Sequence, residues 1–382
     1  MGLSAPGAGT AAGASGGRAG SAAPSEDAGS AGPSLEDLGG WAVLLGRLTR
    51  GEDLSAAEAA AGLTEVLTGT ASPAQVAGFI VALRMKGETV EEMSGLVRAM
   101  LDHAVPVRSP VDTVDTCGTG GDGSRSVNVS TMAALVVAGA GATVCKHGGR
   151  AASSVCGSAD VLEALGVVID LGPEGVARCL VEAGIGFCFA PRFHPAMRHA
   201  IPIRRDLGVP TVFNFLGPLA NPARARRQVV GVSDPAMATK VVGVLEAGGS
   251  RRALVVYGHD GLDELTTTTT STVVDFDAER GGDRLRTYQV DPAELGLHPA
   301  RLEDLRGGDA ATNADIVRSV LGGEPGPRLD IVLLNSAAAL VAAGLAGDLV
   351  EGLGLAESTV KSGQAAAALE RLVTTSRSAS GE

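Results

Sequence analysis

The sequence predicts an α/β protein with a small N-terminal helical domain and a larger α/β domain built on a mostly parallel central sheet. Residues 35–107 carry apolar side chains at three- and four-residue spacing, which is typical of short amphipathic helices. After residue 108, apolar runs of strand length alternate with helical stretches, which is the pattern of βαβ units. The 382 residues, 45% of them hydrophobic, can fill two such domains.

The first 34 residues differ in composition from the rest of the chain. Residues 1–34 consist mainly of Ala, Gly, Ser and Pro, so they have almost no apolar surface to bury and we expect a disordered tail. They also lack the apolar segment of a signal peptide.

Three capping boxes predict the helices of residues 35–107. In each, Ser or Thr is followed three residues later by Glu or Gln, so that the two side chains satisfy backbone N–H groups at the helix start. The pairs are Ser55 with Glu58, Ser72 with Gln75, and Thr89 with Glu92. We expect the turn-rich segment at roughly 193–222 to pack on these helices and to belong to the same domain.

The α/β domain is predicted to comprise residues 108–192 and 223–376. Strands are expected at 111–116, 142–145, 185–190, 228–232 and 253–257. Helices are expected at 132–139, at 158–165 with Ser158 as its cap, at 173–183 and at 235–247. A short apolar run at 331–334 and two Ala-rich helices are expected to close the domain.

Composition excludes several classes of function. A net charge of −12 and a pI near 5.0 argue against nucleic acid or an anionic membrane surface as a partner. The five cysteines contain no CxxC pair, which argues against a zinc site or a disulfide framework and indicates reduced thiols. We therefore expect a cytoplasmic protein without a membrane-spanning segment.

A glycine-rich loop at 117–123 follows the first predicted strand. Gly118, Gly120 and Gly123 fit the dinucleotide-binding pattern G-x-G-x-x-G, which is weak on its own. Asp122 would put a negative charge in a dinucleotide's phosphate cradle, and an ordinary glycine-rich turn is the alternative. A pocket for a phosphorylated small molecule is favoured by the polar residues near the same strand ends, namely Asn128, Ser130, Thr131, Lys146 and Arg150.

A second candidate site follows the strand at 253–257. Asp263 and Glu264 lie just beyond its carboxyl end, which is where open parallel sheets bind ligands. Adjacent carboxylates suit Mg²⁺, which prefers oxygen ligands and keeps waters that substrate phosphates can replace. The alternative is a solvated acidic turn.

Six motifs together make the chain, from about Trp41 onward, resemble the anthranilate phosphoribosyltransferases. They are Gly-Thr-Gly-Gly-Asp at 118–122, Asn-Val-Ser-Thr at 128–131, Lys-His-Gly-Gly-Arg at 146–150, Phe-His-Pro-Ala-Met at 193–197, Asn-Phe-Leu-Gly-Pro-Leu-Ala-Asn-Pro at 214–222 and Asp-Glu-Leu-Thr at 263–266. The resemblance implies an active site in the hinge cleft between the two domains and a homodimer formed through the helical domain. It also implies transfer of the phosphoribosyl group of phosphoribosyl diphosphate to anthranilate, with two Mg²⁺ ions per active site.

The resemblance assigns roles to residues of this sequence. Phosphoribosyl diphosphate would be bound by Gly118, Gly121, Asp122, Ser126, Asn128, Val129, Ser130, Thr131, Lys146, His147, Gly148, Gly149, Arg150, Ala151, Ala152, Ser153, Ser154 and Ser158. Anthranilate would be bound by Gly118, His147, Gly149, His194, Arg204 and Pro218. The metal ligands would be Ser130, Asp263 and Glu264. No nucleophile is expected, since positioning and electrostatics, including Lys146, can stabilise the leaving diphosphate.

Gly149 departs from the family pattern, which usually has Asn at this position, in contact with the aromatic acceptor. The missing amide leaves open a related aromatic amine as the acceptor. A pyrimidine nucleoside phosphorylase-type enzyme and a non-catalytic binding homologue are further alternatives, but the Asp263–Glu264 pair argues against both.

Overall fold

The computed structural model describes residues 1–2, 32–151 and 155–381 of the chain. All helices and strands belong to one compact unit, Pro33–Glu382. The expected disorder of the N-terminal tail and the roles expected for Ala152, Ser153 and Ser154 therefore fall mainly or wholly outside the described residues.

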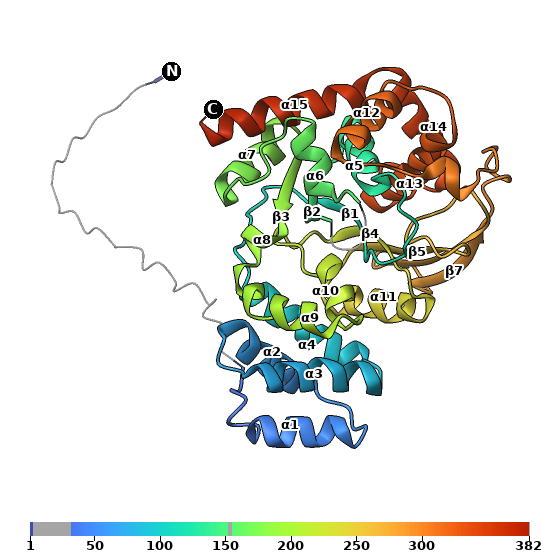
Figure 1. The fold of residues 1–382 in the computed structure, drawn as a ribbon. Helices are drawn as coiled ribbons and strands as arrows, with labels where there is room; N and C mark the ends of the chain where they lie inside the picture. Colours follow the sequence, from blue (N-terminus) through green and yellow to red (C-terminus); the bar gives the residue numbers. More distant parts are fainter. Residues whose placement is uncertain (3–31, 152–154, 382) are drawn as a thin grey trace. The chain divides into compact units, whose positions relative to one another are not determined.

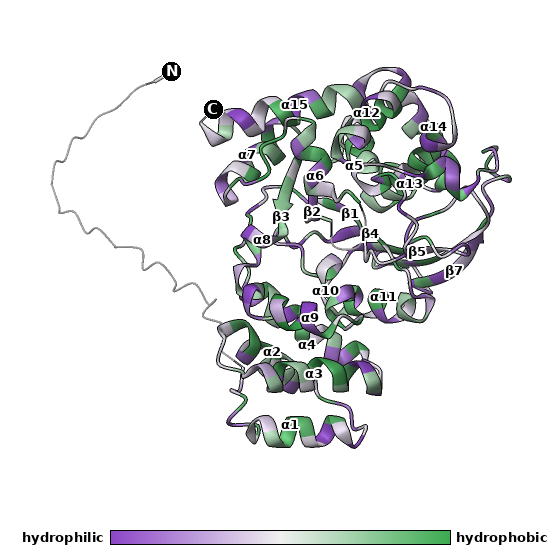
Figure 2. Cartoon of the chain, in the orientation of Figure 1, coloured by the Kyte–Doolittle hydropathy of each residue, from purple (hydrophilic) through white to green (hydrophobic). Residues whose placement is uncertain are grey.

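Four helices form the N-terminal part of this unit (Figure 1). They are α1 (Gly40–Thr49), α2 (Ala56–Thr68), α3 (Pro73–Lys86) and α4 (Val90–Asp102). All three predicted capping boxes are present, because the side chains of Ser55, Ser72 and Thr89 each accept the backbone N–H three residues on. Figure 2 shows hydrophilic and hydrophobic residues alternating along α1 and along the C-terminal helix α15 (Gln364–Ser380), as expected for amphipathic helices.

A sheet of seven strands in the order β3-β2-β1-β4-β5-β6-β7 forms the centre of the α/β part. The strands are β1 (Val114–Gly118), β2 (Val144–Gly148), β3 (Ile185–Phe189), β4 (Arg227–Gly231), β5 (Arg252–Gly258), β6 (Ser271–Asp277) and β7 (Leu285–Val290). The first five in this order are parallel, whereas β6 and β7 pair antiparallel. The predicted fold class, a helical domain plus an α/β domain with a mostly parallel sheet, is confirmed.

The two faces of the sheet bury side chains in two different cores. Val229 of β4 packs with residues of α5 (Val129–Gly139) and α13 (Pro327–Ala343), whereas the next residue, Val230, packs with α11 (Ala238–Ala247) and the N-terminal helices. This alternation follows from the two-residue period of a strand. The remaining helices are α6 (Ser158–Ala164), α7 (Pro173–Glu182), α8 (Ala190–Phe193), α9 (Ile201–Leu207), α10 (Phe213–Leu219), α12 (Ala310–Leu321) and α14 (Leu349–Lys361), with 3₁₀ turns at Pro195–His199, Pro235–Met237 and Leu302–Leu305.

The segment between β3 and β4 lies against the N-terminal helices. Helix α9 contacts α3, and α10 contacts both α4 and β2. Phe213 and Leu216 of α10 share a core with Phe79 of α3. Helix α10 therefore connects the N-terminal helices to the sheet. Among the described residues, no helix has the length and apolar character needed to cross a membrane.

Several predicted elements are wrong or shifted. The apolar run at 331–334, which was not assigned to a helix or a strand, lies inside α13. Ser158 is the first residue of α6, and Gly157 occupies the cap position. Strand β2 extends to Gly148, so Lys146 and His147 lie in the strand instead of a following turn. Strands β6 and β7 were not predicted.

Candidate active site

The candidate site lies where the carboxyl ends of the parallel strands meet. The chain passes from β1 to β2 on one side of β1, whereas β4 lies on the other, so the strand order reverses between β1 and β4. Such a reversal separates the loops that follow the two strands and leaves room for a ligand. The glycine loop follows β1, and Asp263 and Glu264 follow β5.

Two paired glycines form the floor beneath the acidic pair. Gly118 and Gly231 are in register at the ends of β1 and β4. A Cβ on Gly118 would collide with the Asp263 carboxylate, and a Cβ on Gly231 would collide with the Asp263 backbone carbonyl. Gly118, expected to line the phosphate, is thus required here for the close approach of Asp263.

The glycine loop holds a conformation that needs glycine at three further positions. Gly120, Gly121 and Gly123 have φ angles of 69°, 81° and 70°, a region that side chains other than glycine rarely adopt. The Gly120 N–H donates to Asp263 Oδ2 at 2.7 Å, and Asp122 lies close enough to the Asp263 carboxyl to raise its pKa. The loop and the acidic pair therefore form one structure, although 143 residues separate Gly120 from Asp263.

Asp263 is buried and Glu264 is half-buried, with little compensating charge beside them. Burial, and then the charge of Asp122, raises the pKa of Asp263 to about 7. Burial and the neighbouring Asp263 raise the pKa of Glu264 well above its usual value, although Lys146 and the Ser130 N–H oppose this shift. Two adjacent carboxyls that resist ionisation form a site where a cation gains most from binding.

Lys146 is the main cation beneath the acidic pair. Its side chain is buried, and Nζ donates to the Thr116 carbonyl at 2.6 Å and to Ser130 Oγ at 3.3 Å. Lys146 therefore lies under the loop, at the start of α5, and does not extend into solvent.

The first turn of α5 brings together the expected polar residues. Thr116 Oγ1 donates to the Ser130 carbonyl, and Thr131 is buried. Asn128 donates to the Cys156 carbonyl at 3.0 Å and accepts from the Asn313 amide at 2.8 Å. Asn128 thus links the start of α5 to the loop before α6 and to α12.

The turn after β2 supplies a second wall. Gly148 lies so close to Ser158 that a Cβ would collide with Ser158 Oγ, which donates to the Gly149 carbonyl at 3.3 Å. The Arg150 guanidinium is paired with Asp160 and Glu163 at 2.9 and 2.8 Å, and these bonds raise its pKa. The Ala151 N–H also donates to Asp160. In this structure the Arg150 charge is therefore already neutralised.

Arg204 and His147, both expected to bind anthranilate, contact different parts of α10. The Arg204 guanidinium packs over the Phe213 ring at 5.2 Å, and burial lowers its pKa. It has no carboxylate partner among the described residues. His147 Nδ1 lies 3.2 Å from the Gly217 carbonyl. Since a helix rises about 1.5 Å per residue, the two contacted positions, Phe213 and Gly217, lie roughly 6 Å apart along the axis of α10.

The imidazoles of His147 and His194 form a buried neutral pair, with ring centroids 5.1 Å apart. Burial, and then His194, lowers the pKa of His147 to about 3, and its Nε2 has no hydrogen-bond partner among the described residues. His194 Nε2 lies 2.9 Å from the Ala220 carbonyl. Pro218 of α10 accepts a hydrogen bond from Gln228 through its carbonyl.

Comparison with known proteins decides the family. A family model described as "Glycosyl transferase family, a/b domain" matches residues 110–366, and its helical bundle counterpart matches residues 42–104. The anthranilate phosphoribosyltransferase of Roseiflexus castenholzii is 55% identical over 331 residues, which cover 86% of this chain and 96% of that protein. The chain belongs to the anthranilate phosphoribosyltransferase family.

Solved structures of the family have the same fold. Anthranilate phosphoribosyltransferase from Thermus thermophilus matches with a TM-score of 0.82 and 44% identity, covering 87% of this chain and 99% of that one. The Saccharomyces cerevisiae enzyme in complex with PRPP and Mg matches with a TM-score of 0.80 and 29% identity, covering 88% and 98%. The same yeast enzyme is also known in complex with 4-fluoroanthranilate.

The structure gathers the residues of the glycine loop, of the start of α5 and of the acidic pair at one edge of the sheet. These are residues that the family resemblance assigned to phosphoribosyl diphosphate and metal. Three residues were not predicted. Gly231 makes room for Asp263, Asn313 holds Asn128, and Ser233 Oγ donates to the Gly120 carbonyl at 3.1 Å. No local pattern marks them, because their contacts come from distant parts of the chain.

The oxygen atoms of the acidic pair are suitable ligands for magnesium. Among the described residues no group of three or more His, Cys, Asp or Glu side chains forms a closed metal site. Mg²⁺ usually takes one or two protein carboxylates together with waters and substrate phosphates, so a closed site is not required. The carboxyls of Asp263 and Glu264 provide such oxygens.

Proposed function

We propose that this protein transfers the phosphoribosyl group of 5-phosphoribosyl 1-diphosphate to anthranilate, giving N-(5-phosphoribosyl)anthranilate and diphosphate in tryptophan biosynthesis. The observation that carries the proposal is that the structure offers sites for two ligands, one at the edge of the sheet and one at helix α10. A glycine loop faces an acidic pair, and the unpaired Arg204 cation lies at the start of α10. The family relatives carry this activity in their names.

The glycine loop, the start of α5 and the acidic pair bind the donor in this proposal. The open φ angles of Gly120, Gly121 and Gly123 let backbone N–H groups turn toward phosphate oxygens. Ser126, Asn128 and Ser130 lie near the N-terminus of α5, which favours anions. Asp263, Glu264 and Ser130 would hold Mg²⁺, as two ions, and the yeast relative's complex with PRPP and Mg supports the use of magnesium. Bound Mg²⁺ supplies charge that stabilises the departing diphosphate.

Arg204 and the histidine pair bind the acceptor. A guanidinium can make two parallel hydrogen bonds to a carboxylate, and Arg204 has its charge free for the anthranilate carboxylate. His147 and His194, both held neutral by burial, add a flat apolar surface for the aromatic ring. The yeast relative's complex with 4-fluoroanthranilate supports an aromatic acceptor.

The reaction depends on positioning the two substrates, and it needs no covalent catalysis by a side chain. The anthranilate amine forms a bond to the anomeric carbon while the C–O bond to diphosphate breaks, and the electron pair of that bond leaves with the diphosphate. The amine nitrogen then releases one N–H proton to solvent, which gives the secondary amine of the product. Lys146 acts from below, since its buried ammonium contacts Ser130 and opposes the raised pKa of Glu264. No side chain is needed as a nucleophile, and trapping of a covalent ribosyl-enzyme would contradict this mechanism.

The decisive experiment follows the fluorescence of anthranilate in the presence of phosphoribosyl diphosphate. We expect the anthranilate signal to be consumed only with both the donor and magnesium present. Absence of turnover with anthranilate, together with turnover of another aromatic amine, would reassign the acceptor. Phosphorolysis of a pyrimidine nucleoside would overturn the proposal.

Replacing Gly149 by asparagine is expected to raise kcat/KM for anthranilate. A Cβ at Gly149 would meet only the Ala190 Cβ, at 4.0 Å, so the side chain fits without strain. The new amide could donate to the acceptor, and one such bond is worth about 0.5–1.5 kcal/mol, or roughly 2- to 12-fold. An unchanged or lower kcat/KM for anthranilate would favour a related aromatic amine as the natural acceptor.

Replacing Met85 by glutamate is expected to shift the protein from dimer to monomer in sedimentation equilibrium. We propose a homodimer formed through the helical domain, because apolar side chains are exposed on α1, on α3, on α9 and just after α9. They are Val43, Met85, Ile201 and Val209. A charge in a contact of this kind is costly to bury. The matched control is Val350→Glu, at an exposed position on α14, and a dimer that survives Met85→Glu would contradict this interface.

We also propose that the protein works in the cytoplasm. All five cysteines are buried, and none of them forms a disulfide among the described residues. Cys145 Sγ and Cys188 Sγ lie 3.4 Å apart without a disulfide, which suits a reducing compartment.

A further inference from the structure

A second set of cavities lies at the opposite, amino-terminal edge of the sheet. One, of about 280 Å³, separates the segment 109–113 from the segment 223–226. The other, of about 210 Å³, lies between the segment 219–228 and helices α4 and α11. Both begin just before β4, and a strand of that length places them roughly 13 Å from Gly231 at the candidate active site. No residue lining them belongs to that site.

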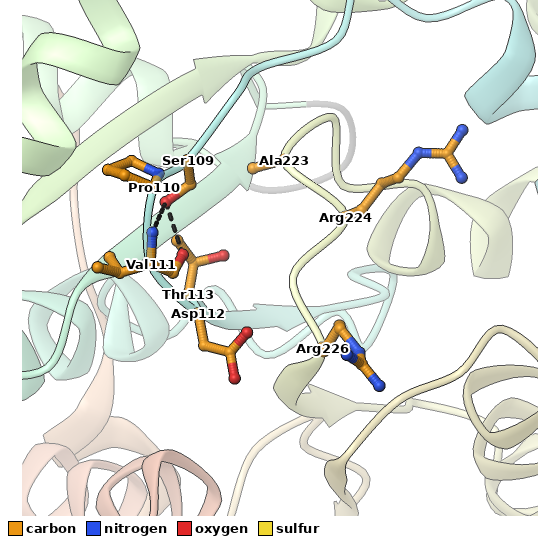
Figure 3. Close-up of a pocket in the computed structure, with 8 residues that line it drawn as sticks. All are labelled: Ser109, Pro110, Val111, Asp112, Thr113, Ala223, Arg224 and Arg226. Atoms are coloured by element: carbon orange, nitrogen blue, oxygen red, sulfur yellow. Dashed lines mark hydrogen bonds between the residues drawn. The ribbon is translucent and has the colours of Figure 1, made fainter. Parts of the chain in front are cut away.

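Arg224 and Arg226 line both cavities. Figure 3 shows their side chains extending away from the segment 109–113. Arg226 Nε donates to the Gly249 carbonyl at 3.0 Å, but its charge has no carboxylate partner among the described residues. Arg224 makes only a loose contact of 3.8 Å to Asp102, with both side chains largely exposed. Two cations thus stand at the rim with little to neutralise them.

The smaller cavity joins these cations to an apolar lining. Its walls include Val97 and Leu101 of α4, Leu219 of α10, Ala225, and Val244 and Leu245 of α11. Gln228, Asn221 and Ser250 add polar residues to its lining. A small apolar pocket with a few converging polar groups is the usual form of a ligand site.

The backbone at the rim is held in an unusual conformation. Arg224 has a φ of 51°, which is uncommon for a residue other than glycine. The Arg224 N–H donates to the Asn221 carbonyl at 2.8 Å, which fixes the turn that carries the guanidinium. Strain of this kind is concentrated at binding sites, where the surrounding structure maintains it.

We propose that the smaller cavity, called the slot below, binds a small carboxylate with an aromatic or other flat apolar body and acts as a regulatory site. The guanidiniums of Arg224 and Arg226 would bind the carboxylate, and the apolar walls from α4, α10 and α11 would hold the body. A cavity of about 210 Å³ suits a ligand of this small size. The proposed acceptor, anthranilate, itself belongs to this class.

A buried hydrogen-bond chain connects the slot to the candidate active site. Asn221, which lines the slot, donates to Asp115 Oδ2 at 2.7 Å and to the Cys145 carbonyl at 2.8 Å. Asp115 Oδ1 accepts the His147 N–H at 3.2 Å. His147 precedes the Gly148–Gly149 turn, so a ligand that fixes Asn221 also fixes this turn. Occupancy of the slot would thereby favour one arrangement of the acceptor wall.

Calorimetric titration with benzoate tests the site, using the Arg204→Gln variant so that the acceptor end does not contribute. We expect one binding event, and at least about tenfold weaker binding of the neutral analogue benzamide, since a charge-assisted hydrogen bond is worth about 1.5–3 kcal/mol. Adding Arg226→Gln should weaken benzoate at least about tenfold as well. The matched control, Arg318→Gln on the exposed face of α12, should leave benzoate binding unchanged.

Arg224→Gly separates loss of binding from loss of folding. Glycine adopts the φ of 51° without strain, so the variant should keep the melting temperature of its parent while it binds benzoate more weakly. Benzoate should also slow amide exchange at His147. The proposal is overturned if millimolar benzoate gives no binding heat, if neither arginine change weakens binding, or if exchange at His147 is unaffected. None of these outcomes depends on turnover, so failure here is distinct from failure of the proposed activity.

Discussion

Replacing Gly231 by alanine is expected to destabilise the protein by about 3 kcal/mol or more and to remove its activity, because overpacking against a backbone has no cheap relief. Gly231 ends β4, and a Cβ there would occupy the position of the Asp263 carbonyl. The obstacle is main chain, so Asp263 and Glu264 must move away from the glycine loop. Thermal unfolding and kcat/KM would both report the displacement.

Gly354→Ala is the matched control for this substitution. Gly354 lies within α14, and a Cβ there meets nothing within 4 Å. Alanine is the better helix former by about 1 kcal/mol, so this variant should be as stable as the parent or more stable, with unchanged activity. A Gly231→Ala protein with normal melting and turnover would show that the acidic pair is not fixed by the floor of β1 and β4.

The sequence predicts the fold where local signals are strong. The capping boxes at Ser55, Ser72 and Thr89 were recognisable because each depends on two residues three positions apart. Strands β6 and β7 were missed although Ser271–Asp277 alternates in part, because a run of threonines precedes it and no helix follows. The run at 331–334 has no periodicity that separates a buried strand from a buried helix.

In the candidate site too, some residues could be predicted from local sequence and others could not. The glycine loop and the acidic pair could be assigned to strand ends from their place in the chain, and the structure brings them into contact. Gly231 could not be found, since its role depends on the backbone of Asp263, which lies much further along the chain and returns over it. The burial of Lys146 was equally hidden, because a lysine in a strand sequence does not reveal which carbonyl receives its ammonium.

Replacing Asp263 by asparagine is expected to lower kcat/KM by about 10²–10³-fold, because it removes one of the charges that hold magnesium at the leaving group. The same change should stabilise the ligand-free protein at pH 8. Asp263 is buried beside Asp122, and its pKa of about 7 lies above the usual 3.8. The folded state therefore binds this proton more tightly than the unfolded state, so the stability of the ligand-free parent falls as pH rises from about 4 to about 7.

Asparagine mimics the protonated carboxyl at every pH. Its amide can donate to Asp122, and its oxygen can accept the Gly120 N–H. We expect parent and variant to melt alike only below about pH 4, where Asp263 is protonated in both the folded and the unfolded state, and the variant to be more stable at pH 8 by on the order of 2–4 kcal/mol. Magnesium with phosphoribosyl diphosphate should raise the melting temperature of the parent but not of the variant. Asp315→Asn, an exposed carboxylate on α12, is the control and should change none of these values. Equal melting of the Asp263→Asn variant and the parent at pH 8 would mean that Asp263 is ionised without cost. In that case, burial of Asp263 would not destabilise the ligand-free protein, and magnesium binding would have no such destabilisation to relieve.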